Sequence, residues 1–138
     1  MAAALTVGDV AERSGVAVSA IHFYERQGLV QSWRTEGNQR RYTKAGLQRL
    51  SFIRHSRELG FPIEDIKTLL ELTQHPDKPC HDAHGIAVRH LGQVQRRIAK
   101  LRRLERELKR LSQCDGDTIS DCAVIETLAD HGLCETDH

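Results

Sequence analysis

Four cysteines are the residues of this 138-residue chain whose type and spacing best suit a chemical role. Three of them fall within residues 114–138, and the full set is Cys80, Cys114, Cys122 and Cys134. Met1–Ala4 carries no basic residue and no apolar run approaches a membrane span, so we expect no signal peptide, no membrane segment and a cytoplasmic protein. In that compartment, clustered cysteines are typical of metal-binding or redox-active sites rather than structural disulfides.

Cys114 and Cys122 enclose a loop of seven residues. We expect Asp121 to cap a short helix that begins at Cys122, and a helix N-terminus favours the thiolate form that binds soft metals. Three thiolates suit mercury or lead in trigonal geometry, and they suit zinc or cadmium if an oxygen or imidazole adds a fourth ligand. His81 and His84 are candidates for that auxiliary ligand.

Between Cys80 and Cys114 the apolar residues recur at intervals of three and four, with charged residues between them. This pattern predicts one amphipathic helix of roughly 30 residues, about 45 Å long. Its narrow apolar seam is expected to pair, in antiparallel or parallel orientation, with the same helix of a second chain. A helix folded back on its own domain is the alternative. The seam consists of Leu91, Val94, Ile98, Leu101, Leu104, Leu108 and Leu111.

An antiparallel pairing of two such helices would bring the start of one beside the end of the other. Cys80 would then lie next to Cys114 and Cys122 of the partner subunit. We therefore predict a metal site made of Cys80, Cys114 and Cys122, with two sites in a homodimer, each bridging both chains.

Two short helices are predicted near the N-terminus. Thr6 is expected to cap the first, which ends at Gly15, and Ser19 is expected to cap the second, which runs through Gln27. Helix, glycine-containing turn and helix within about 22 residues is the helix-turn-helix pattern. Ile21 and Phe23 on the second helix are expected to be core residues.

The segment from Leu29 to Tyr42 reads as a strand-like hairpin rich in arginine, which we interpret as a wing beside a recognition helix. Residues 1–60 hold nine Lys or Arg against five Asp or Glu, residues 61–113 hold eleven against seven, and residues 114–138 hold none against seven. A basic body with an acidic tail indicates a polyanionic partner. The predicted contacts to double-stranded DNA are Ser19, His22, Tyr24 and Arg26 of the helix and Arg34, Asn38, Arg40, Arg41 and Tyr42 of the wing.

A third helix capped by Thr43 and a fourth opened by Pro62 complete the N-terminal part. The expected fold is mainly α: a winged helix-turn-helix domain followed by a long dimerisation helix and a C-terminal metal-binding loop with a short helix. The predicted domains are residues 1–75, 80–113 and 114–138.

These residues carry a resemblance to the MerR family of transcriptional regulators. It rests on TVGDVAERSG, SAIHFYERQG, RTEGNQRRY, LQRLSFIRHSRELG and IEDIKTLLEL, together with the long helix and the cysteine loop. The N-terminal half is particularly similar to the redox-sensing SoxR branch, whereas the C-terminal third resembles the metal-sensing branch. The copper(I) sensors carry serine where this chain has Cys80, so the resemblance points to divalent soft metals. Family members often carry arginine where this chain has His22.

The resemblance implies a regulator that is not an enzyme. Such a dimer binds a palindromic promoter with an over-long spacer, with and without metal. On binding metal it bends and untwists the DNA so that RNA polymerase can engage.

Alternatives remain open at this point. A thiol-based redox or electrophile sensor on the same DNA-binding scaffold would use a reversible Cys114–Cys122 disulfide. Intervals of 33, 7 and 11 residues between the cysteines disfavour an iron–sulfur cluster. Scattered histidines without an HExxH motif disfavour a metallohydrolase. Cys134 could form a peripheral ligand set with His131 and His138, or belong to a frayed tail.

Overall fold

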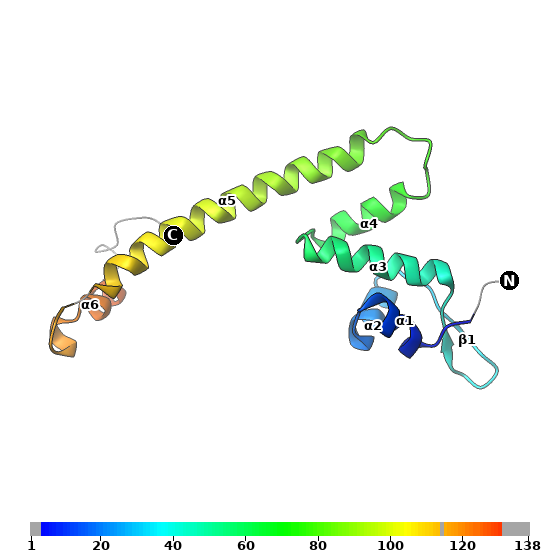
Figure 1. Ribbon diagram of the computed structural model, residues 1–138, viewed down its shortest axis with the longest axis horizontal. Coiled ribbons are helices and arrows are strands. Elements are labelled where there is room, and N and C mark those ends of the chain that lie inside the picture. Colours follow the sequence, from blue (N-terminus) through cyan, green and yellow to red (C-terminus); the bar gives the residue numbers. More distant parts are fainter. Residues whose placement is uncertain (1–3, 114, 131–138) are drawn as a thin grey trace. The chain divides into compact units, whose positions relative to one another are not determined.

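The computed structural model describes residues 4–113 and 115–130 of the chain. It divides into two compact units, Met1–Ile86 and Ala87–His138, which are described separately below. The fold is mainly helical, as predicted (Figure 1). In chain order the elements are α1 (Val7–Ser14), α2 (Val18–Arg26), β1 (Trp33–Arg34), β2 (Arg40–Arg41), α3 (Lys44–Glu58), α4 (Ile63–Leu72), α5 (His81–Ser112), a 3-10 turn (Ile119–Asp121) and α6 (Ala123–Ala129).

The N-terminus of α1 is closed by a reciprocal pair of hydrogen bonds. The backbone N–H of Asp9 donates to Thr6 Oγ1 and the backbone N–H of Thr6 donates to Asp9 Oδ2, each at 3.0 Å. Thr6 is therefore the N-cap that the sequence predicts. Because the bonds from Thr6 stabilise the charged carboxylate, they lower the pKa of Asp9.

The start of α2 differs from the prediction. The N-cap is Ala17 and the helix begins at Val18, so Ser19 lies inside the first turn and does not cap it. The extended backbone of Ala17 sets this boundary without a side-chain hydrogen bond. Ser19 is exposed as a result and its hydroxyl lies on the helix surface.

One core joins the helices of the first unit. Val10 of α1, Ile21 of α2, Leu50 and Ile53 of α3 and Ile66 of α4 are completely buried. Figure 1 shows α1 lying against α3, and α2 packs against α1. This packing fixes which face of α2 is left for solvent, because Ile21 must point inward.

Arg54 of α3 forms a hydrogen bond with the chain where α1 ends and the turn to α2 begins. Its Nη1 donates to the carbonyl of Ser14 at 3.3 Å, and its Nε lies 3.1 Å from Glu58 Oε1. Gly15 in that turn has a φ of 74°, which only glycine adopts without strain.

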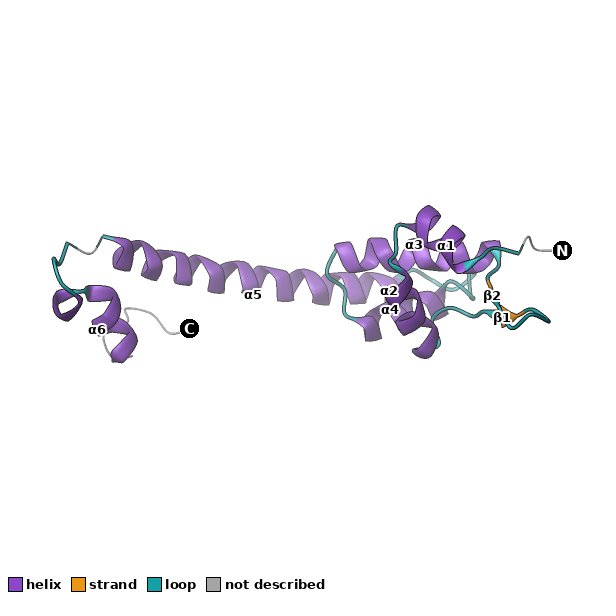
Figure 2. Cartoon of the chain, turned by 90° about the horizontal axis from the view of Figure 1, so that it is seen from below, coloured by secondary structure: helices purple, strands orange, loops and turns teal. Residues whose placement is uncertain are grey.

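The predicted wing is an antiparallel hairpin in which Trp33 pairs with Arg41 and Arg34 with Arg40. Figure 2 shows it extending beyond the helices of its unit. Asn38 closes the turn with a φ of 62°. At the base, Leu5 and Tyr42 exchange two backbone hydrogen bonds of 2.9 and 2.8 Å, which anchor the hairpin to the chain before α1.

α5 runs for 32 residues, close to the predicted length. Four seam residues stand largely in solvent in the single chain: Leu91 (55% exposed), Ile98 (42%), Leu101 (64%) and Leu108 (63%). Leu101, Leu104 and Leu108 line an open apolar hollow of about 480 Å³. Among the described residues, no helix combines the length and the apolar character needed to cross a membrane.

α6 starts without the predicted cap. Cys122 is its N-cap and makes no side-chain capping hydrogen bond, while Asp121 is the last residue of the preceding 3-10 turn. Because Asp121 belongs to that turn, it does not occupy the N-cap position of α6.

We predict that Gly15→Ala and Gly28→Ala each lower the free energy of unfolding by about 1 kcal/mol, because alanine is strained at positive φ. At Gly15 the new Cβ would also collide with the Arg54 guanidinium. Gly85 of α5 is the matched control, since a Cβ there meets open space and alanine favours the helix. Thermal unfolding checks this, and three variants of equal stability would contradict it.

Candidate nucleic-acid interface and metal-ligand cysteines

One face of α2 is left open by the burial of Ile21. Ser19, Phe23 and Arg26 are exposed and His22 is half-buried. Their spacing of three and four residues places them on one side of the helix. Three of the four helix residues predicted to contact DNA therefore share one face, and Tyr24 is half-buried beside it.

Phe23 departs from its predicted core position, because 42% of it is exposed. Its ring packs edge-on against Tyr24, with centroids 5.6 Å apart. The spacing of four residues between Ser19 and Phe23 indicates that both lie on the same exposed face of α2. This spacing is a better guide to the position of Phe23 than its apolar character. Trp33 at the start of β1 is exposed to the same extent and was missed by the sequence reasoning.

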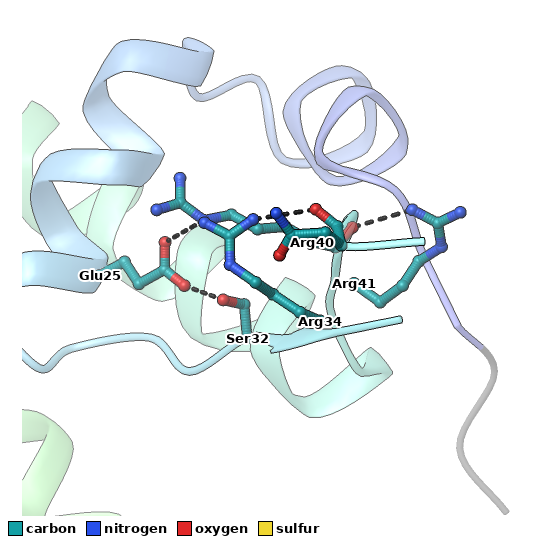
Figure 3. Close-up of polar contacts among 6 residues, drawn as sticks. Glu25, Ser32, Arg34, Arg40 and Arg41 are labelled. Atoms are coloured by element: carbon teal, nitrogen blue, oxygen red, sulfur yellow. Dashed lines mark hydrogen bonds and ion pairs between the residues drawn. The ribbon is translucent and has the colours of Figure 1, made fainter. Parts of the chain in front are cut away.

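The side chains of Arg34 and Arg41 both form hydrogen bonds within the wing hairpin (Figure 3). Arg34 Nη1 donates to the carbonyl of Asn38 at 3.0 Å. Arg41 donates from Nη1 to the carbonyl of Arg40 and from Nη2 to Gln39 Oε1, at 3.0 and 2.9 Å. These hydrogen-bond acceptors are neutral oxygens, although the charge of Arg41 also acts on the Asp9 carboxylate and helps to lower its pKa.

Arg40 lies differently. Its Nε is 3.5 Å from Glu25 Oε2, so its charge is paired with a carboxylate of α2. Figure 3 shows Arg41 on the side of the hairpin away from Glu25. Arg40 and Arg41 are neighbours in sequence, but they have different electrostatic surroundings.

The predicted DNA contact from Tyr42 needs correction. Its side chain is completely buried, so it has no surface to offer DNA. Burial, together with the negative charge of Glu25, raises the pKa of Tyr42. Tyr42 is a core residue at the base of the wing, and the pairing of Leu5 with Tyr42 explains its enclosure.

The described sensor cysteines occupy the ends of helices. Cys80 is a free, exposed thiol directly before α5, and Cys122 is half-buried at the start of α6. His81 and His84, the predicted auxiliary ligands, are exposed on the first turn of α5. Cys114, Cys134, His131 and His138 lie outside the described residues.

Within residues 4–113 and 115–130, no three His, Cys, Asp or Glu side chains gather closely enough to hold a metal ion. The donor chemistry of the two described cysteines nevertheless suits a thiophilic ion, because thiolates are the ligands that soft metals prefer. The predicted three-cysteine site stays a prediction.

The loop before Cys122 is folded tightly on itself. A Cβ at Gly116 would lie 2.9 Å from the carbonyl carbon of Asp121, which leaves room only for glycine. Thr118 Oγ1 lies 2.9 Å from Ser120 Oγ and donates to Asp121 Oδ2 at 3.4 Å. This local network shapes the approach to Cys122.

A helix-turn-helix with a basic wing, followed by a long helix with thiols near its ends, defines the class as a DNA-binding regulator. Two family models match the chain: the MerR HTH family regulatory protein over residues 5–73, and the MerR DNA-binding region over residues 47–111. The chain therefore belongs to the MerR family, whose members are transcription regulators.

The regulator ZntR of Escherichia coli (strain K12) is 39% identical over 127 residues, covering 88% of this chain and 90% of ZntR. Among solved structures, the transcription regulator PbrR691 of Ralstonia metallidurans CH34 in complex with lead(II) is 34% identical. It covers 90% of this chain and 98% of its own, with a TM-score of 0.79. HiNmlR, a MerR family regulator lacking the sensor domain and bound to promoter DNA, is 27% identical, with a TM-score of 0.56 over 79% of this chain and 83% of its own.

We predict that Arg41→Ala weakens binding to a DNA duplex selected from random sequence by the wild-type protein. The slope of log affinity against log salt should fall by about one unit, as expected for the loss of one phosphate contact. Arg57→Ala is the matched control, because Arg57 is exposed at the C-terminal end of α3 and should leave the slope unchanged. Equal slopes for wild type and Arg41→Ala would show that Arg41 is a solvated charge.

Proposed function

We propose that this chain is a metal-responsive transcriptional regulator. It binds promoter DNA as a homodimer and activates transcription in the cytoplasm by distorting that DNA when it binds zinc, cadmium, lead or mercury. The observation that carries the proposal is that one unit combines an exposed face of α2, which bears Ser19 and Arg26, with a wing whose Arg34 and Arg41 side chains donate hydrogen bonds to neutral oxygens.

The DNA-binding surface that we propose uses the accessible members of the predicted set except Arg40, whose charge is paired with Glu25. A recognition helix presents its first turns to base edges, while arginines and backbone groups of a wing hold phosphates. Its members are Ser19, His22, Tyr24, Arg26, Arg34, Asn38 and Arg41. MerR-type binding of promoter DNA is supported by the complex of HiNmlR.

The homodimer is supported by the exposed seam of α5. Large apolar side chains repeated along one stripe of a long helix are costly to leave in water, and a second copy of the same helix would cover them. Two half-sites of a palindromic promoter also need two recognition helices. We assign residues 1–75 to DNA binding, 80–113 to dimerisation and 114–138 to sensing.

The sensing step that we propose uses thiolates from both chains. In an antiparallel pair of α5 helices, Cys80 would lie beside Cys114 and Cys122 of the partner subunit, and three thiolates suit a divalent soft ion. Solved complexes of similar proteins support metal sensing: PbrR691 is in complex with lead(II), and the regulator MerR from Bacillus megaterium MB1 is in complex with mercury(II). A bridge between the chains would favour one relative orientation of the two DNA-binding units, and therefore one DNA shape for RNA polymerase.

We predict that Ile98→Asp converts the protein from about twice the chain mass of 15.6 kDa to monomer and abolishes binding to the selected duplex. A charge at a seam position would have to be buried without a partner. Arg96→Asp, at an exposed position on the opposite side of the same helix, should remain dimeric. Sedimentation at micromolar concentration decides this, and a monomeric wild type would refute the proposed dimer.

We predict that Cys80→Ser, Cys114→Ser and Cys122→Ser each abolish metal-dependent transcription but keep DNA binding, because a hydroxyl cannot replace a charged soft ligand. Cys134→Ser is the control and should change the metal response little. Since thiols lose protons when they bind metal, metal affinity should also fall as the pH is lowered.

The decisive form of this experiment mixes chains. A heterodimer of Cys80→Ser with the double variant Cys114→Ser/Cys122→Ser keeps one intact site if the ligands come from both chains. It keeps none if all three come from one chain. Two high-affinity ions in the wild-type dimer with none in this heterodimer would refute the cross-chain site.

A further inference from the structure

Glu25 of α2 is the acidic side chain enclosed between the recognition helix and the wing. Its side chain is only 18% exposed and its two carboxylate oxygens have different partners. Ser32 Oγ donates to Oε1, and Arg40 Nε lies 3.5 Å from Oε2. Ser32 precedes β1 and Arg40 lies in β2, so one carboxylate contacts both sides of the hairpin (Figure 3).

The hairpin needs such an anchor. Each of its strands has two residues, and an isolated two-stranded ribbon is marginally stable in water. The backbone pairing of Leu5 with Tyr42 holds the end that leads into α3. Glu25 links the hairpin to α2, the helix beside which the wing must be placed.

The position of Glu25 is unexpected on electrostatic grounds. A carboxylate on the helix that we propose for DNA recognition repels phosphates, and a buried carboxylate is costly unless it is paired. The Arg40 ion pair offsets that cost. It also cancels the charge of Arg40, so that the pair presents no net charge to DNA.

We propose that Glu25 is a positioning residue for DNA recognition: its carboxylate fixes the wing relative to α2 through Arg40 and Ser32, and Arg40 acts through this pair rather than as a phosphate ligand. This inference rests on the proposed DNA-binding function. It separates Arg40 from Arg41, whose guanidinium donates its hydrogen bonds to neutral oxygens.

The experiment measures the affinity of the full-length protein for the selected duplex and for a scrambled duplex of the same composition, over a range of salt. Glu25→Gln removes a negative charge with little change in shape, and Glu36→Gln removes the same charge from the exposed turn of the wing as a matched control. If Glu25 only repels DNA, both variants bind more tightly. If Glu25 positions the wing, Glu25→Gln weakens binding to the selected duplex by about fivefold, the loss expected for one partly exposed ion pair.

Binding to the scrambled duplex should not weaken in Glu25→Gln, because non-specific binding needs charge but no fixed wing position. Arg40→Gln should weaken selected-duplex binding to a similar extent without lowering the salt slope. The double variant Glu25→Gln/Arg40→Gln should lose no more than either single one, because the two residues act as a unit. Arg41→Gln, in contrast, should weaken binding to both duplexes and lower the slope by about one unit.

Tighter binding of Glu25→Gln to the selected duplex, or a salt slope that falls in Arg40→Gln as it does in Arg41→Gln, would overturn the proposal. If Glu25→Gln unfolds below the assay temperature, Arg40→Gln carries the same test, because Arg40 is more exposed than Glu25. A wild-type protein that selects no duplex from random sequence would contradict the proposed function instead, so the two failures are distinguishable.

Discussion

The exposed apolar seam of α5 is the constraint on which the account of this molecule depends. Leu91, Ile98, Leu101 and Leu108 are exposed on a 32-residue helix whose other positions are mostly polar or charged. Covering the seam with a second copy of α5 would supply two recognition helices for a palindromic promoter. It would also bring cysteines from two chains together. Pairing of the seam with a second chain would therefore connect the proposed DNA-binding and sensing functions.

In the N-terminal unit, the packing of the core determines where the charged side chains of α2 and the wing lie. Burial of Ile21 decides which face of α2 remains open, and the enclosed Tyr42 fixes the base of the wing. The three wing arginines then take different roles according to their partners. Arg34 and Arg41 donate hydrogen bonds to neutral oxygens, whereas Arg40 is paired with Glu25. Such distinctions depend on geometry, because the residue type alone is the same in all three cases.

The sequence predicted the features that depend on local physics. The Thr6 cap follows from its spacing to Asp9, and the extent of α5 follows from its apolar repeat. The start of α2 was wrong, because Ala17 sets it without a side-chain bond. The enclosure of Tyr42 and its pairing with Leu5 join segments 37 residues apart, which no local pattern reveals. The metal ligands remain a prediction, since they would come from two chains.

The most direct test of the central claim is native mass spectrometry of the anaerobically purified protein incubated with zinc or cadmium. The account predicts a dimer of twice the 15.6 kDa chain mass that carries two tightly bound ions. A dimer that stays free of metal, while Cys114 and Cys122 form a reversible disulfide under mild oxidant, would contradict metal sensing and favour a thiol-based redox sensor.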